Sequence, residues 1–255
     1  SRGLGDVYKR QYQGQGPDEI TIIGHVGIDE TNRRFFVSDH GKLKIFAYDL
    51  DSVLTTPEYQ PSVKIDMKKK LFPDDYLYLN DTLCIAKIIE PIGNNDYKPS
   101  VARWNMATGE INPMPYEYPD LKKVRFIYAA SAEHQLYVQC YTQYDLMTIC
   151  DFNGNLKCNI YGPKWVNEKT QTQHYSLGVE FCGDKILALY SGGDHRTDAY
   201  YPTKFLVFDL NGNYLKTLET GYMITDFCYD KENNRLIINL NDEIQFAYLD
   251  LEGII

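Results

Sequence analysis

The side chains best suited to catalysis or metal binding are widely separated along this chain. The histidines are residues 25, 40, 134, 174 and 195, and none of the six cysteines forms a C-x-x-C pair. Zinc sites and redox motifs are recognised by closely spaced ligands of these types. The chain also lacks a G-x-S-x-G elbow, an H-E-x-x-H helix and a phosphate-binding glycine loop. The sequence therefore predicts no catalytic residue, no metal site and no cofactor.

Two Asp-x-Asn-x-Asn segments, which begin at Asp151 and Asp209, look like the start of a calcium-binding loop. An EF-hand loop requires glycine at its sixth position and glutamate at its twelfth. Here glycine is at the fourth position, and the twelfth is Gly162 or Thr220. We therefore interpret both segments as hairpin turns.

The cysteines are interpreted as buried free thiols. The alternative at one place is a disulfide between residues 150 and 158, which flank the first turn.

A repeated phrase indicates which elements hold these residues in place. An apolar strand is followed by Asp or Asn, one apolar residue and a turn that usually contains glycine. Aspartate and asparagine bond to backbone amides where strands end, and glycine supplies the positive φ of a tight reversal. The phrase therefore predicts a strand and a hairpin, and it occurs five times, at Asp49, Asn105, Asp151, Asp209 and Asp250.

Each phrase is preceded by a polar turn and another apolar strand, with a further strand candidate before it. No long segment has helical periodicity. Repeated four-stranded units of this length are typical of propeller blades. We predict an all-β fold, specifically a β-propeller of four-stranded blades, with about five blades present out of an expected six. The alternative is an irregular β-sandwich. The single domain spans 12–255, with blades near 20–70, 72–120, 124–162, 174–221 and 222–255, the last without its fourth strand.

Composition and charge exclude some classes of partner. The net charge is −9, from 26 basic and 35 acidic residues, whereas nucleic-acid binding draws on a basic excess. The one dense basic run, at 68–70, is interpreted as solvated loop charge. No stretch of apolar residues is long enough to span a membrane. We expect neither a nucleic-acid partner nor a transmembrane segment.

Three long connections, at 90–99, 162–169 and 192–202, interrupt the regular spacing of the strands. In a propeller, connections between second and third strands emerge on the same face as links between blades, so these excursions are expected to share one face. Aromatic platforms with polar groups suit glycans, peptides or proteins. Alternatively, the aromatic rings pack on their own blades. The candidate ligand-binding residues are Tyr97, Lys98, Trp165, His195, Arg196, Asp198, Tyr200 and Tyr201.

The stretch from Gly24 to Asp49, with GHVGIDE, FFVSD and IFAYD, resembles one NHL-type blade. The junction GQGPDEI at 14–20 is similar to the link between blades in TolB-like six-bladed propellers of Bacteroidetes. The resemblance implies that a sixth blade is missing upstream from an N-terminally truncated fragment, and that the protein is secreted or lipid-anchored at the cell envelope. It implies no catalytic residue. Residues 1–11 look like a translated adapter and are given no structural weight.

Three functions remain as hypotheses. The first is a non-enzymatic propeller that binds a glycan, peptide or protein through the loop-rich face. The second is a metal-assisted hydrolase or lyase, similar to lactonases, with its site at the mouth of the central channel, and it rests on analogy of fold alone. The third is a structural or assembly module without a small ligand.

Overall fold

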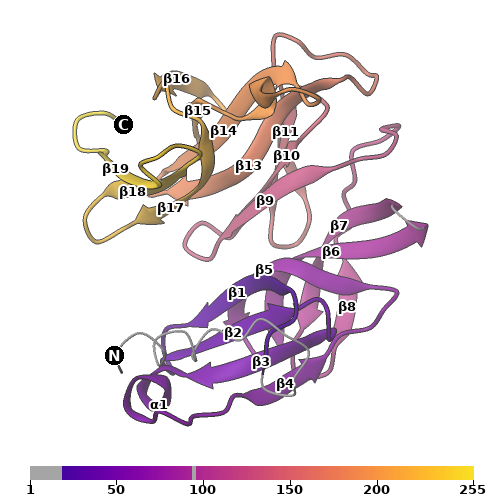
Figure 1. The fold of residues 1–255 in the computed structure, drawn as a ribbon. Helices are drawn as coiled ribbons and strands as arrows, with labels where there is room; N and C mark the ends of the chain where they lie inside the picture. The colour runs from indigo at the N-terminus through magenta and orange to yellow at the C-terminus, as the bar shows by residue number, and fades with distance from the viewer. Residues whose placement is uncertain (1–18, 94–95) are drawn as a thin grey trace. The chain divides into compact units, whose positions relative to one another are not determined.

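The computed structural model describes residues 19–93 and 96–255, and in these residues the chain forms five antiparallel sheets (Figure 1). Residues 1–11 and most of the 14–20 junction lie outside the described residues. Within each sheet the strands follow one another in chain order. The chain divides into two compact units, Ser1–Pro113 (unit 1) and Met114–Ile255 (unit 2).

Unit 1 contains two four-stranded sheets whose first strands, β1 and β5, lie beside each other. Its core packs between the two sheets, with Phe36, Ile88 and Trp104 almost completely buried. The elements are β1 (Ile23–Asp29), β2 (Arg34–Asp39), β3 (Lys44–Asp49), α1 (Leu50–Thr55), β4 (Ser62–Asp66), β5 (Phe72–Asn80), β6 (Leu83–Gly93), β7 (Asp96–Asn105) and β8 (Glu110–Pro113).

Unit 2 contains two four-stranded sheets and one three-stranded sheet. The first strand of each sheet again lies beside the first strand of the next, β9 with β13 and β13 with β17. The elements are β9 (Phe126–Ser131), β10 (Leu136–Tyr141), β11 (Leu146–Asp151), β12 (Leu156–Tyr161), β13 (Thr172–Cys182), β14 (Lys185–Asp194), η2 (Asp198–Tyr200), β15 (Lys204–Asp209), β16 (Tyr214–Glu219), β17 (Ile224–Asp230), β18 (Arg235–Leu240) and β19 (Phe246–Asp250).

Position within a sheet explains the residue pattern of each strand. The second strand β10 is buried at all six residues, because both faces of its sheet are covered, and its sequence is apolar almost throughout. The fourth strand β12 is exposed or half-buried along its length, and Lys157 and Asn159 interrupt its apolar residues. The two apolar cores of unit 2 lie between consecutive sheets, so burial of one sheet depends on its neighbour.

The hairpin interpretation of the Asp-x-Asn-x-Asn segments is confirmed. Asp151 Oδ1 accepts the backbone N–H groups of Asn153 and Asn155 at 2.8 and 2.9 Å, and Asp209 does the same in its own turn. Gly154 has φ +80°, a conformation that glycine adopts without steric cost. The carboxylate of each aspartate therefore stabilises its own turn.

No disulfide crosses the first of these turns, and both thiols are free. The strand register pairs Cys158 with Ile149 and Cys150 with Leu156, so the two cysteines are not cross-strand partners. The Cys158 thiol instead lies 3.4 Å from the carbonyl of Asn211.

Two connections differ from the sequence prediction. After Asp49 the chain forms the short helix α1 rather than a tight hairpin, because the Asp49 carboxylate caps that helix by accepting the Ser52 N–H at 2.8 Å. The excursion at 90–99 was expected to be a loop. It is instead an extension of the β6–β7 hairpin, in which Pro91 pairs with Tyr97 and Glu90 with Lys98.

The last sheet has three strands, in the order β17-β18-β19, which agrees with the sequence expectation that its fourth strand is lacking. Within the described residues, β19 therefore has a strand partner on one side only. Its aromatic side chains are largely exposed, 68% for Phe246 and 63% for Tyr248.

Candidate ligand-binding site

The predicted binding residues are divided between the two units. Tyr97 and Lys98 lie on β7 in unit 1. The remaining candidates lie in unit 2, in the β12–β13 link and in the excursion between β14 and β15. A common face for all three excursions stays a prediction, but the two in unit 2 contact one another, because Lys164 Nζ donates to the Gly192 carbonyl at 3.5 Å.

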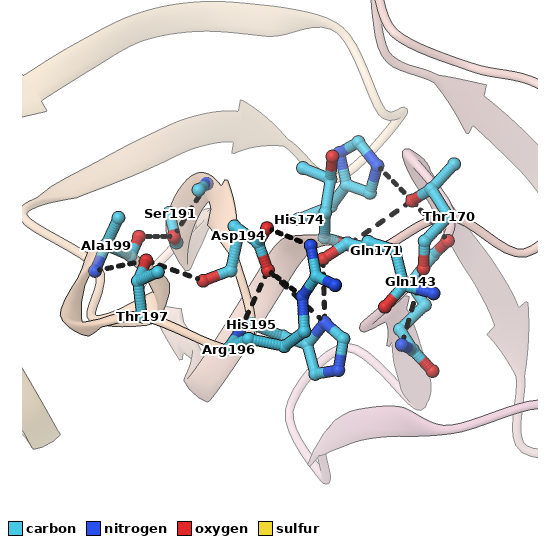
Figure 2. A network of polar contacts seen from close by, with 12 residues as sticks. Gln143, Thr170, Gln171, His174, Ser191, Asp194, His195, Arg196, Thr197 and Ala199 are labelled. Atoms are coloured by element: carbon cyan, nitrogen blue, oxygen red, sulfur yellow. Dashed lines mark hydrogen bonds and ion pairs between the residues drawn. The ribbon is translucent and has the colours of Figure 1, made fainter.

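Figure 2 shows that the excursion after β14 is held by its own polar contacts and by the β12–β13 link. The backbone N–H and ring Nδ1 of His195 bond to the Gln171 carbonyl at 3.1 and 2.9 Å. Since a carbonyl only accepts, His195 Nδ1 is the donor in this contact.

The charge of Arg196 is neutralised within the same turn. Its guanidinium donates to both oxygens of Asp194, with Nη2 to Oδ2 at 2.7 Å, and this holds the pKa of Asp194 well below its usual range. Arg196 is thus a turn-stabilising residue in this structure. Further along, Asp198 begins the 3-10 turn η2, and the rings of Tyr200 and Tyr201 are stacked with centroids 4.2 Å apart.

Trp165 has several aromatic neighbours. Its ring centroid lies 5.8 Å from that of Tyr118, 5.1 Å from Tyr161 and 6.3 Å from Tyr144. Tyr161 is 51% exposed and Trp165 and Tyr118 are half-buried, so this group reaches the surface. We call Tyr118, Tyr161 and Trp165 the aromatic platform.

Hydrogen bonds fix the geometry of the platform. The hydroxyls of Tyr118 and Tyr161 are 3.3 Å apart, and this bond, with a smaller contribution from burial, raises the pKa of Tyr118 to about 12. Behind them Tyr144 is buried and its hydroxyl donates to the Lys122 carbonyl at 2.8 Å. These hydrogen bonds hold the tyrosine rings of the group in place.

The β12–β13 link begins with an anchor on Asp145, which lies in the β10–β11 turn. The Asp145 carboxylate accepts the Lys164 N–H at 2.9 Å, and its backbone carbonyl accepts the Gly162 N–H at 2.8 Å. A Cβ atom at residue 162 would lie 2.2 Å from the carboxylate oxygens, so only glycine fits there. This anchor positions Trp165 directly after it in the chain.

A cavity of about 320 Å³ adjoins the platform and shares Tyr161 with it. Asp145, Tyr190 and Lys204 line it together with apolar side chains of β12 and β15. Behind its wall His174 is buried, with Nδ1 3.2 Å from the Tyr190 hydroxyl and 3.7 Å from Asp145 Oδ1. Burial lowers the pKa of His174, against the charge of Asp145, so its imidazole is neutral near pH 7.

Sequence reasoning identified Trp165 but missed Tyr118, Tyr161 and Asp145. Tyr118 and Tyr161 are two of the 22 tyrosines and had no distinguishing spacing. Asp145 follows a buried strand in what reads as an ordinary polar turn. The Gly162-Pro163 pair at the start of the long link was the one available signal for a special contact there.

Among residues 19–93 and 96–255, no group of three or more His, Cys, Asp or Glu side chains could hold a metal ion. Within the same ranges, no helix is long and apolar enough to cross a membrane.

The family described as a 6-bladed beta-propeller, DUF5128, matches residues 7–82. The whole chain is also similar in structure to solved propellers. A member of the DUF4221 family from Bacteroides vulgatus superposes with a TM-score of 0.59 at 12% identity, covering 92% of this chain and 79% of that one. The chain folds as a β-propeller. The predicted fold class is thereby confirmed, and each sheet is a blade.

Two further structures are similar at this level. The extracellular domain of a putative one-component system from B. thetaiotaomicron has a TM-score of 0.57 at 10% identity, covering 91% of this chain. This chain spans 28% of that domain. A gluconolactonase from Xanthomonas campestris has a TM-score of 0.51 at 16% identity, covering 86% of this chain and 69% of that one. No curated protein matches the chain in sequence. Identities this low show the fold alone, and the TolB-like or NHL-like assignment stays a prediction.

Proposed function

We propose that this propeller is a non-enzymatic binding module that engages a glycan, peptide or protein through the face carrying the aromatic platform. The observation that carries the proposal is the platform itself. Trp165, Tyr118 and Tyr161 form a partly exposed aromatic surface where two excursions meet, beside a cavity.

Aromatic rings of this kind bind the C–H faces of sugars and the apolar side chains of peptides, while their hydroxyls accept or donate hydrogen bonds. The platform is supported from behind by Tyr144. A rigid aromatic surface loses little conformational entropy on binding, which favours recognition. Tyr97, Lys98, His195, Tyr200 and Tyr201 are proposed as secondary contacts.

We further propose an extracellular or cell-envelope location. It is supported by the similarity to the extracellular domain from B. thetaiotaomicron and by the likeness to envelope propellers of Bacteroidetes. A metal-assisted hydrolase or lyase is the second hypothesis, and its support is the fold shared with the gluconolactonase.

The test is a screen of glycan and peptide arrays with the intact chain, followed by titration of any hit against Trp165→Ala and Tyr161→Ala. We expect each substitution to weaken binding by about tenfold or more, since a central aromatic contact is worth roughly 2 kcal/mol. The matched control is Phe246→Ala, an exposed aromatic of the same unit on β19. If Trp165→Ala and Tyr161→Ala bound the ligand as tightly as Phe246→Ala and the original chain, the platform would be refuted as the binding surface.

Tyr97→Ala and Tyr200→Ala test the secondary contacts in the same titration. A loss with Tyr97→Ala would show that unit 1 contributes to the ligand site. No loss would restrict the site to unit 2.

A further inference from the structure

The cavity beside the aromatic platform has mostly apolar walls. Its volume is about 320 Å³, and Ile160, Leu206 and Phe208 line it together with four tyrosine rings. Sites for small ligands begin at about 300 Å³, and a closed cavity of about 150 Å³ already holds a benzene ring. A phenyl group or a leucine side chain therefore fits in this space.

The polar side chains in the walls of the cavity are bonded to one another. A hydrogen bond joins the Tyr190 hydroxyl to the Asp145 carboxylate, and the same hydroxyl lies 3.2 Å from His174 Nδ1. The Tyr214 hydroxyl is 2.8 Å from Thr217 Oγ1. A sugar ring would bring several hydroxyls against groups that are already engaged, and a buried polar group without a partner is costly. An apolar group needs no hydrogen-bond partner there.

The cavity and the platform are continuous, because Tyr161 belongs to both. Tyr161 is 51% exposed, whereas Tyr175 and Tyr190, which line the cavity, are 1% and 8% exposed. A ligand that covers the platform can therefore insert a side group past Tyr161. Polypeptides bind in this way, with one large side chain in a desolvated pocket and weaker contacts around it.

We propose that the cavity is a subsite for one large apolar side chain of a polypeptide ligand, such as phenylalanine or leucine, while the residues next to it lie across the platform. The inference rests on the binding role proposed for the platform, and it narrows the ligand from glycans, peptides and proteins to polypeptides.

The first experiment titrates the unaltered chain with N-acetyl-L-phenylalaninamide, N-acetyl-L-alaninamide and methyl β-D-glucoside, followed by NMR chemical shifts. We expect the phenylalanine probe to bind at least about tenfold more tightly than the alanine probe, because its ring moves from water into an apolar cavity. Equal affinity for the two amides, binding of neither, or tighter binding of the glucoside would overturn the proposal.

The position of the phenylalanine probe is checked on a chain with ¹³C-labelled methyl groups. We expect intermolecular NOEs from the phenyl ring to the methyl groups of Ile160 and Leu206, which line the cavity. Unit 2 has a second cavity, of about 600 Å³, which is lined by Ile244 and Ile254. NOEs to that second pair alone would refute the proposal.

A filled cavity provides the matched variant. Leu206→Trp places an indole in the space, and Leu215→Trp makes the same change at a leucine that is 43% exposed and does not line the cavity. We expect the phenylalanine probe to bind at least about tenfold more weakly to Leu206→Trp alone. Equal affinity of the two variants would contradict the proposal. The probe comparison and the NOEs decide the question on the unaltered chain even if Leu206→Trp folds poorly.

Failure of the subsite is distinguishable from failure of the platform. Binding of the phenylalanine probe that survives Trp165→Ala, with no array hit, would retain the subsite and reject the platform. Array hits restricted to glycans and weakened by Trp165→Ala would retain the platform and reject the subsite.

Discussion

Removing the Asp145 carboxylate tests whether one buried anchor positions the aromatic platform. Asp145→Ala leaves the Lys164 N–H without the acceptor that now lies 2.9 Å away, whereas Asp145→Asn retains an oxygen at that place. A hydrogen bond to a charged group contributes about 1.5–3 kcal/mol. We therefore expect unit 2 of Asp145→Ala to be about 2 kcal/mol less stable than that of Asp145→Asn, and Asp145→Asn to lie within about 1 kcal/mol of the original chain.

The two tryptophans allow the effect to be localised, because Trp104 is in unit 1 and Trp165 is in unit 2. Incorporation of 5-fluorotryptophan gives one ¹⁹F NMR signal for each unit during urea unfolding. In Asp145→Ala we expect the Trp165 signal to shift in native buffer and to unfold earlier, with the Trp104 signal unchanged. Identical Trp165 signals and midpoints in the alanine and asparagine variants would refute the anchoring role.

Three further predictions concern stability and reactivity. Because burial lowers the pKa of His174 below its ordinary value of 6.5, the unfolded chain binds the proton first. The stability contributed by neutral His174 is thus full above about pH 6.5 and declines as the pH falls through it. The urea midpoint of the original chain should therefore fall between about pH 7.5 and about pH 5.5, and that of His174→Gln should fall by less. An equal fall in both proteins would contradict this prediction. Trp104→Ala should destabilise unit 1 by about 3–5 kcal/mol, because this side chain is 2% exposed and lies in the core between the two sheets of the unit. Urea unfolding measures the loss, and a cost below about 1 kcal/mol would argue against that packing. A water-soluble thiol reagent should modify exposed Cys228 in the native chain. It should modify Cys84 only after unfolding, because this thiol is buried and burial raises its pKa to about 12. Mass spectrometry measures both, and early modification of Cys84 would be the contrary result.

The strands and hairpin turns were predictable because their signals are local. An aspartate at a strand end with Asn and Gly after it determines its own turn, as Asp151 and Asp209 show. The same local chemistry was ambiguous at Asp49, where the carboxylate caps a helix instead. At 90–99 the polar, proline-containing sequence concealed a strand pair, because pairing across a hairpin depends on the opposite strand and not on composition.

The site was less predictable because it depends on how blades pack. Trp165 was identified from its place in a long link, but its partners Tyr118 and Tyr161 come from a different link and from β12. Asp145 lies beside Gly162 through the pairing of β11 with β12 in its own blade, whereas His174 is brought to it only when the next blade docks. No spacing in the sequence encodes these contacts.

Among residues 19–93 and 96–255, β19 is paired with another strand on one side only, and this bears on how the chain behaves in solution. A strand edge of this kind, with exposed aromatic side chains, is a template for pairing with another copy of the chain. We expect self-association to rise with protein concentration through this edge, so binding isotherms gain a second equilibrium at high concentration. Phe246→Lys introduces a charge on this edge and should reduce self-association. It leaves the residues of the aromatic platform unchanged.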